Sequence, residues 1–288
     1  MESPKDFKNK VVVITGGAGG IGQAVSAGFG FLGARIIILG KSRGNFKILQ
    51  KNLGKKIKLE FYAVEVSKER QVWEAVKKII AKHHKIDVLI NAAGILGPVG
   101  QFHTNPLKDW SRVISVNLIG TANVCHAVLP YMVKQKQGKI INFSGGGSVN
   151  PFPNFSGYAV SKAAIVRFTE NLAAEYRASN IQVNAVAPGA VNTKFLKNTL
   201  AAGKKQAGES YYTKALAQKQ NGGDSPLLAA GLIDFLCRPD NLLTGKLISA
   251  KWDDWKKFTA KDIELLNNNS EYTLRRIDNQ FFKEIKKS

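Results

Sequence analysis

Short apolar runs alternate with longer amphipathic segments along this chain. Most of the runs are rich in Val and Ile and are bounded by Gly, Asn or Lys. Strands of a buried parallel sheet have this pattern, because both faces of such a sheet are covered. We expect seven strands, at 11–15, 36–39, 59–64, 86–90, 139–143, 181–187 and 246–250.

The segments between these runs have the length of helices. Ser67 stands before one of them as an expected N-cap, and Pro226 after Ser225 indicates the first turn of another. Strands that alternate with helices predict an α/β fold, here a Rossmann-like doubly wound parallel sheet with helices on both faces. The expected helices are 20–32, 43–53, 68–83, 106–134, 157–178 and 225–236.

No internal repeat or low-complexity linker divides the 288 residues. We expect one Rossmann-fold domain over 1–250, with a lid at about 190–224, followed by a C-terminal extension over 251–288. The extension packs on the domain or on a neighbouring subunit. Trp252 and Trp255 flank two acids in it, and this segment closes over a ligand or contacts another subunit.

Composition excludes several classes of protein. No apolar stretch approaches the ~18 residues of a membrane span, and the first ten residues do not resemble an export signal. The net charge is +21, but the lysines are scattered and arginine-rich patches with interleaved aromatics are absent. We therefore expect a cytoplasmic protein that binds neither membrane nor nucleic acid. Cys125 and Cys237 are expected to be buried free thiols, with no metal site.

A glycine cluster lies between the first expected strand and the first helix. It has the spacing TGxxxGxG over 15–22. There the chain turns sharply, the backbone approaches a diphosphate, and the helix N-terminus faces it with free N–H groups. The motif predicts a dinucleotide site.

The end of the second strand indicates which dinucleotide binds. An acid at that position accepts hydrogen bonds from a ribose 2′-hydroxyl, whereas a 2′-phosphate requires cations. The chain has Gly40 there, followed by Lys41 and Arg43. This favours NADP(H), with NAD(H) as the alternative. Glu65, after the third strand, is expected near the adenine.

Tyr158 and Lys162 lie four residues apart in an expected helix, so they share one face. A phenol has an ordinary pKa near 10. A nearby ammonium group lowers that pKa, and the Tyr then becomes a usable proton donor or acceptor.

Five motifs together resemble the classical short-chain dehydrogenase/reductase family over about residues 8–250. The resemblance implies that Tyr158 is the general acid/base, that Lys162 assists it and holds the nicotinamide ribose, and that Asn117 keeps a water in the proton relay. It also implies hydride transfer between the nicotinamide and a carbonyl or secondary alcohol. The motifs are TGxxxGxG, NAAG at 91–94, Asn117 in VNLIG, YxxxK at 158–162 and PGAVNT at 188–193. The residues expected at the cofactor are Gly16, Gly20, Ile21, Gly22, Gly40, Lys41, Arg43, Glu65, Asn91, Ala92, Gly94, Tyr158, Lys162, Pro188, Gly189, Val191 and Thr193.

One family residue is missing. The serine that steadies the substrate carbonyl usually stands thirteen residues before the Tyr, where this chain has Gly145. Ser144 is the first candidate to replace it and Ser148 the second, because a Gly-rich loop can redirect either hydroxyl. If neither does so, the chain is a sensor or scaffold that binds NADP(H) with altered or lost catalysis.

The sequence gives only general expectations for the substrate and for the oligomeric state. Six lysines of the lid suggest a carbonyl or alcohol substrate with a phosphate or carboxylate group. The alternative is that they follow the Lys-rich composition. The apolar faces of 106–134 and 157–178 resemble those with which the family forms homodimers and homotetramers. The six lysines are Lys194, Lys197, Lys204, Lys205, Lys214 and Lys219.

Overall fold

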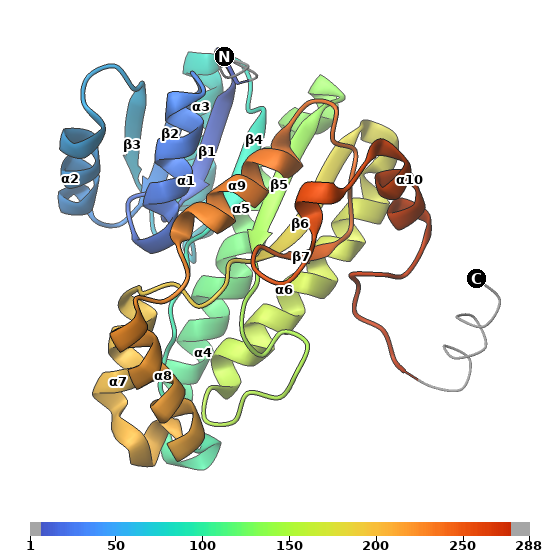
Figure 1. Ribbon diagram of the computed structural model, residues 1–288. Coiled ribbons are helices and arrows are strands. Elements are labelled where there is room, and N and C mark those ends of the chain that lie inside the picture. Colours follow the sequence, from blue (N-terminus) through green and yellow to red (C-terminus); the bar gives the residue numbers. More distant parts are fainter. Residues whose placement is uncertain (1–6, 278–288) are drawn as a thin grey trace.

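The computed structural model describes residues 7–277, which form a seven-stranded sheet flanked by helices (Figure 1). Our expectations for residues 1–6 and 278–288 lie outside the described residues. The strand order is β3-β2-β1-β4-β5-β6-β7, and every neighbouring pair is parallel. The doubly wound Rossmann-like fold is thereby confirmed. The strands are β1 (Val11–Thr15), β2 (Arg35–Gly40), β3 (Leu59–Ala63), β4 (Val88–Asn91), β5 (Gly138–Phe143), β6 (Ile181–Ala187) and β7 (Leu247–Ser249).

Successive side chains of a strand point to opposite faces of the sheet. In β1, Val12 and Ile14 pack into one buried cluster, whereas Val11 and Val13 pack into another. Both faces are therefore apolar, which explains why the strand sequences are apolar runs rather than alternating ones.

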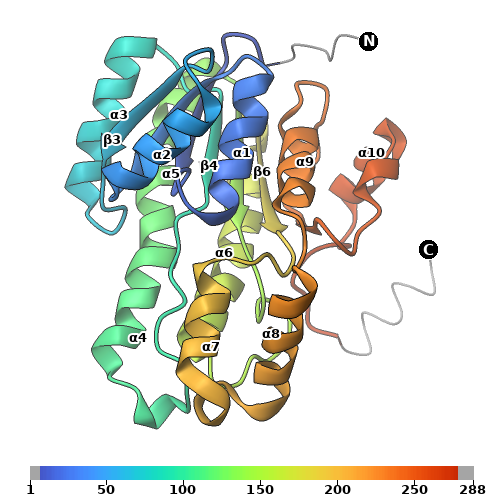
Figure 2. The ribbon, with the colours of Figure 1, turned by 60° about the vertical axis from the view of Figure 1, so that its left-hand side comes forward.

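Helices cover both faces of the sheet (Figure 2). The cluster with Val12 also contains residues of α1, α2, α9 and α10, and the cluster with Val11 contains residues of α3, α5 and α6. The long helices of the two layers are α1 (Gly20–Phe31), α2 (Arg43–Leu53), α3 (Glu69–His83), α5 (Gly120–Gln135), α6 (Ser156–Glu175), α9 (Pro226–Cys237) and α10 (Ala260–Asn268).

The expected helix 106–134 consists of three consecutive helical parts. α4 (Leu107–Ile114) continues through a π-helical turn (Ser115–Ile119) into α5. Such turns often occur at functional sites, and this one contains Asn117. The stretch Leu107–Gln135 is long and apolar enough to cross a membrane, but half of its most apolar window is buried inside the domain. It is equally typical of a core helix.

Two helix starts were predicted from capping residues. Ser225 caps α9, since its hydroxyl accepts from the Leu227 N–H, and Pro226 follows it in the first turn. The prediction for Ser67 is wrong: the N-cap of α3 is Lys68, without a side-chain cap. The Ser67 hydroxyl donates to Glu65 instead, at 3.3 Å.

The expected lid contains two helices that extend beyond the carboxyl ends of the strands (Figure 1). These are α7 (Lys194–Ala207) and α8 (Glu209–Asn221), which pack against each other. Gly203 and Gly208 have φ values of 81° and 83°, a backbone conformation that favours glycine. The short 3-10 helices are Phe102–Thr104, Arg177–Ser179 and Trp255–Lys257.

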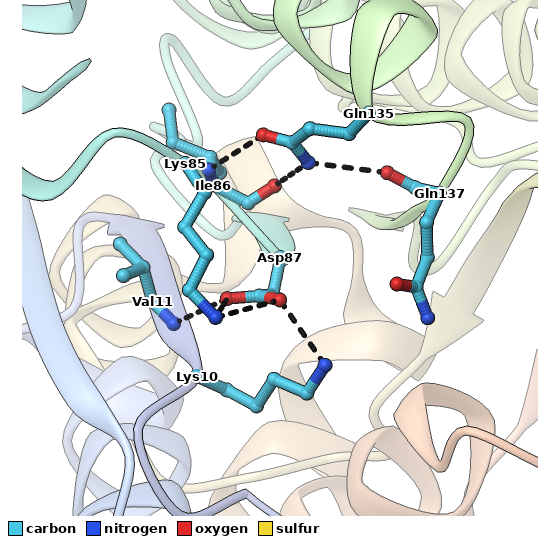
Figure 3. Close-up of polar contacts among 7 residues, drawn as sticks. All are labelled: Lys10, Val11, Lys85, Ile86, Asp87, Gln135 and Gln137. Atoms are coloured by element: carbon cyan, nitrogen blue, oxygen red, sulfur yellow. Dashed lines mark hydrogen bonds and ion pairs between the residues drawn. The ribbon is translucent and has the colours of Figure 1, made fainter.

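A carboxylate holds the amino ends of β1 and β4, opposite the lid (Figure 3). Asp87 accepts from the Val11 N–H at 2.8 Å and forms ion pairs with Lys10 and Lys85. Gln135 joins the end of α5 to the same region through both backbone groups of Ile86. These contacts fix the start of β1 against β4, so that the carboxyl ends of the two strands lie side by side.

Candidate active site

A cavity of about 670 Å³ opens at the carboxyl ends of β5, β6 and β7. The loops after these strands form its inner wall, at the edge where parallel α/β sheets bind ligands. Side chains from α6, α7 and α8 complete it.

Tyr158 and Lys162 come together at this cavity. Both are on α6, and the Lys162 Nζ lies 5.5 Å from the centroid of the Tyr158 ring. Tyr158 lines the cavity, whereas buried Lys162 lies behind it and donates to the Phe143 carbonyl at 2.7 Å. The i, i+4 spacing thus produces the expected pair.

The pKa of each group is shifted by its surroundings. Burial raises the pKa of Tyr158, and the nearby Tyr211 raises it further. Burial lowers the pKa of Lys162 to about 8. From the sequence, Lys162 was expected to lower the pKa of Tyr158. In this structure the pKa of Tyr158 shifts in the opposite direction, and loss of solvation is the largest cause.

The glycine loop links β1 to α1 at the same edge. The N-cap of α1 is Gly19, whose lack of a side chain leaves the first N–H groups uncapped, and the first turn carries no acid. A β-carbon on Gly22 would lie 2.5 Å from the Gly16 carbonyl oxygen, so a side chain there would open the turn. Gly20 lies near Thr193, since its β-carbon would be 3.3 Å from the Thr193 methyl group. These features fit a diphosphate cradle.

Lys41 follows β2 and forms an ion pair with Glu65 after β3, at 2.9 Å. The hydrogen bond from Lys41 holds the pKa of Glu65 below its usual value. Arg43 is the exposed first residue of α2. A β-carbon on Gly40 would meet no atom closer than 3.6 Å, which leaves room at the position that distinguishes the cofactors.

Asn91 is the last residue of β4, and Gly94 follows it after Ala92 and Ala93. The Asn91 amide is buried and donates to Asn142 at 2.9 Å, so its side chain joins two strands. A β-carbon on Gly94 would lie 3.3 Å from Asn117 Oδ1 and 3.8 Å from Lys162 Nζ. Gly94 therefore lies beside Asn117 and Lys162.

The side chain of Asn117 is fully buried and hydrogen-bonded within the protein. Its Oδ1 accepts from the Ile95 N–H at 2.8 Å. Its Nδ2 donates to the Ile95 carbonyl and to Ser161, both at 3.0 Å. Asn117 thus fixes the loop after β4 against α6, the helix of Tyr158.

The two candidate serines have different surroundings. Ser144 is buried, donates to the Lys162 carbonyl at 3.4 Å, and does not line the cavity. Ser148 lines the cavity, and its hydroxyl has no hydrogen-bond partner among residues 7–277. Ser148 therefore lines the same cavity as Tyr158, and Ser144 does not.

The loop after β6 contributes Pro188, Gly189, Val191 and Thr193 to the cavity. Asp224 holds this loop by accepting from the Ala190 N–H at 2.7 Å, and it also forms an ion pair with Lys251 at 2.8 Å.

The lid contributes aromatic and amide groups instead of its lysines. All six lid lysines are exposed, and none lines the cavity. Phe195 packs on Tyr158 with ring centroids 4.8 Å apart, and Tyr211 and Gln218 face the same space. Phe195, Tyr211 and Gln218 were not predicted as site residues from the sequence. Only their position within the predicted lid indicated that they could face the cavity.

Comparisons with known proteins show which family the chain is similar to. A family model described as short chain dehydrogenase matches residues 10–203. The 3-oxoacyl-(acyl-carrier-protein) reductase of Thermotoga maritima is 40% identical over 188 residues, 65% of this chain and 76% of that protein. Dehydrogenase/reductase SDR family member 4 of Sus scrofa is 28% identical over 250 residues, 86% of this chain and 88% of that protein.

Solved structures show the same fold. NAD⁺-bound xylitol dehydrogenase has a TM-score of 0.78 at 28% identity, covering 84% of this chain and 98% of that one. ElxO Y152F with NADPH bound has a TM-score of 0.74 at 29% identity, covering 84% of this chain and 97% of that one.

Proposed function

Because the chain belongs to the short-chain dehydrogenase family, we propose that it is an NADP(H)-dependent oxidoreductase with Tyr158 as general acid/base. It interconverts a carbonyl compound and the corresponding alcohol. The observation that carries the proposal is the convergence of Tyr158, Lys162 and the glycine loop at the cavity edge.

A bound nicotinamide cofactor supplies the hydride in reduction and accepts it in oxidation. In reduction, the Tyr158 hydroxyl donates its proton to the carbonyl oxygen as the hydride reaches the carbonyl carbon. In oxidation, the same oxygen takes the proton back. Burial raises the pKa of Tyr158, so its hydroxyl keeps its proton at neutral pH and can act as a proton donor.

The residues of this chain fit the cofactor in three places. The α1 N-terminus and its glycine loop would hold the diphosphate. Lys41 and Arg43 would bind the 2′-phosphate, since cations bind phosphate and Gly40 carries no competing acid. Lys162 would bind the nicotinamide ribose. The ion pair with Glu65 holds Lys41 at this edge.

Ser148 takes the role of the missing serine. Its hydroxyl lines the same cavity as Tyr158 and has no partner in the described chain, so it is free to donate to a carbonyl oxygen. The Ser144 hydroxyl is directed to a backbone carbonyl. A hydrogen bond of this kind stabilises the negative charge that develops on the oxygen.

Two further parts of the proposal concern assembly and location. Ile119, Val133 and Val160 are exposed apolar residues of the helical segments that precede and carry Tyr158, which supports a homo-oligomer formed through these helices. Light scattering at the monomer mass would contradict it. Two buried free thiols are compatible with a reducing cytoplasm.

The test is cofactor binding followed by turnover. Fluorescence titration is expected to give tight NADPH binding and weaker NADH binding. A panel of ketones is then reduced by the wild-type protein and not by Tyr158→Phe, which retains NADPH binding. Absence of binding for both cofactors would remove the basis of the proposal. Binding without turnover would identify a sensor or scaffold.

A further inference from the structure

The C-terminal extension reaches the cavity at two separate points. Directly after β7, Lys251, Trp252 and Asp253 line it. The chain then forms the 3-10 helix Trp255–Lys257 and α10 along the β7 side of the sheet (Figures 1 and 2), and returns so that Tyr272 and Thr273 line the same cavity. Part of the cavity wall is therefore built by the extension.

Buried and charged groups hold the returning segment in place. Lys246, only 3% exposed, donates to the carbonyls of Asn269 and Glu271 at 2.8 and 2.9 Å. The Leu247 N–H donates to the Tyr272 carbonyl at 2.8 Å, so the segment covers the free edge of β7. This wall is a fixed part of the domain.

Leu274 connects the returning segment to α6, the helix of Tyr158. The Leu274 N–H donates to Glu170 at 2.7 Å, and Arg167 donates to the Leu274 carbonyl at 2.7 Å. Both side chains belong to α6. The wall and the expected proton donor are thereby connected through one helix.

The first segment of the extension is also fixed. The Asp253 Oδ2 accepts from the Ser249 N–H at 2.6 Å, while its Oδ1 has no hydrogen-bond partner in the described chain. Trp255 is buried, donates to the Ala250 carbonyl at 3.1 Å and packs on Phe235. Asp253 thus holds its place between an ordered strand end and a buried ring.

The charge of the cavity differs in sign from that of the protein. The charged residues in its lining are Asp224, Lys251 and Asp253, one cation and two carboxylates. Lys251 and Asp224 neutralise each other in their ion pair, which leaves Asp253. The net charge of +21 comes largely from exposed side chains, whose effect salt screens.

We propose that Asp253 makes the substrate site select neutral or cationic carbonyl compounds and reject anionic ones. The inference rests on the proposed function and gives it a substrate class. The body of the substrate would contact the aromatic side chains Phe152, Phe195 and Tyr211, which suit an apolar or aromatic group. A carboxylate on that group would meet an uncompensated like charge.

Three ketones with one aromatic body test the proposal: 4-acetylbenzoate, its methyl ester, and 4-acetylphenyltrimethylammonium. Their Kd values are measured by calorimetry with NADPH-saturated Tyr158→Phe protein, which binds without turnover. We expect the ester and the cation to bind about tenfold more tightly than the anion. In the Asp253→Asn background that difference should shrink several-fold. The amide oxygen can still accept from Ser249.

The matched control is Asp254→Asn. It removes the same charge one residue away, from an exposed carboxylate that pairs with Lys257 at 2.7 Å and does not line the cavity. It should leave the preference unchanged. The inference would be overturned if the three probes bound equally, if the anion bound most tightly, or if no probe bound. It would also be overturned if both variants had an equal effect. Failure of the proposed function shows separately, as absence of turnover by the wild type.

Discussion

The backbone of Gly145 lies against the hydroxyl of Tyr158. A β-carbon at position 145 would be 2.5 Å from the Tyr158 hydroxyl oxygen and 3.5 Å from Cζ. Glycine at this position therefore does more than omit a serine, because the tyrosine hydroxyl uses the space that a side chain would need. The loop and the Tyr158 ring fit each other as a pair.

Gly145→Ser should consequently lower activity, although it introduces the residue that the family usually has there. The new side chain displaces the Tyr158 hydroxyl or the loop, and a misplacement of about 1 Å can reduce turnover about a hundredfold. Steady-state kinetics with NADPH measures it. Gly146→Ala is the control, since its β-carbon would make an ordinary 3.5 Å contact with Phe152. A rise in kcat for Gly145→Ser would mean that the loop moves to accommodate the side chain, which would contradict the expected clash with Tyr158.

Ser148→Ala should lower kcat on the order of a hundredfold, because a donor to the developing oxyanion is lost. NADPH affinity should stay the same. Ser144→Ala should have a smaller effect on kcat, since its hydroxyl makes only a long bond to the Lys162 carbonyl. The two variants are compared by kcat and by NADPH titration. If Ser144→Ala is the more damaging one, the assignment is reversed.

Gly40→Asp should exchange the cofactor preference. The structure has room for the side chain, and its carboxylate repels a 2′-phosphate while accepting from a 2′-hydroxyl. We expect the NADPH Kd to rise about tenfold or more, with NADH then bound more tightly than NADPH. Gly44→Asp, at the exposed second residue of α2, provides a control for added charge. An unchanged preference would remove Gly40 as the selecting position.

The hydrophobic pattern predicted the fold because a strand that is buried on both faces is a short, continuous apolar run. The predicted strands 11–15 and 181–187 agree residue for residue with β1 and β6. The Tyr158–Lys162 pair followed from helical spacing together with the other family motifs. The choice between Ser144 and Ser148 did not, because a loop of three glycines allows several paths. Asp253 could not be found either, since its role depends on the way the extension folds against β7.

Lys139 offers a test of stability away from the cavity. It is buried, its Nζ donates to the Asn241 carbonyl, and burial lowers its pKa to about 8. In the unfolded chain a lysine has a pKa near 10.4. Between these values the unfolded state binds more protons than the folded state. The contribution of Lys139 to the free energy of unfolding must therefore rise with pH over this window.

Below pH 8 both states carry the proton, and the folded state bears the full cost of a buried ammonium group. Lys139→Met removes that cost, so its stability relative to wild type should be highest near pH 7 and should fall towards pH 10. Urea midpoints at several pH values measure the difference. The buried thiols of Cys125 and Cys237, whose pKa values burial raises, act in the opposite direction in both proteins and largely cancel. Lys55→Met, which removes an exposed ammonium group, should show no such trend. A difference between Lys139→Met and wild type that stays constant from pH 7 to 10 would show that Lys139 does not titrate in this range.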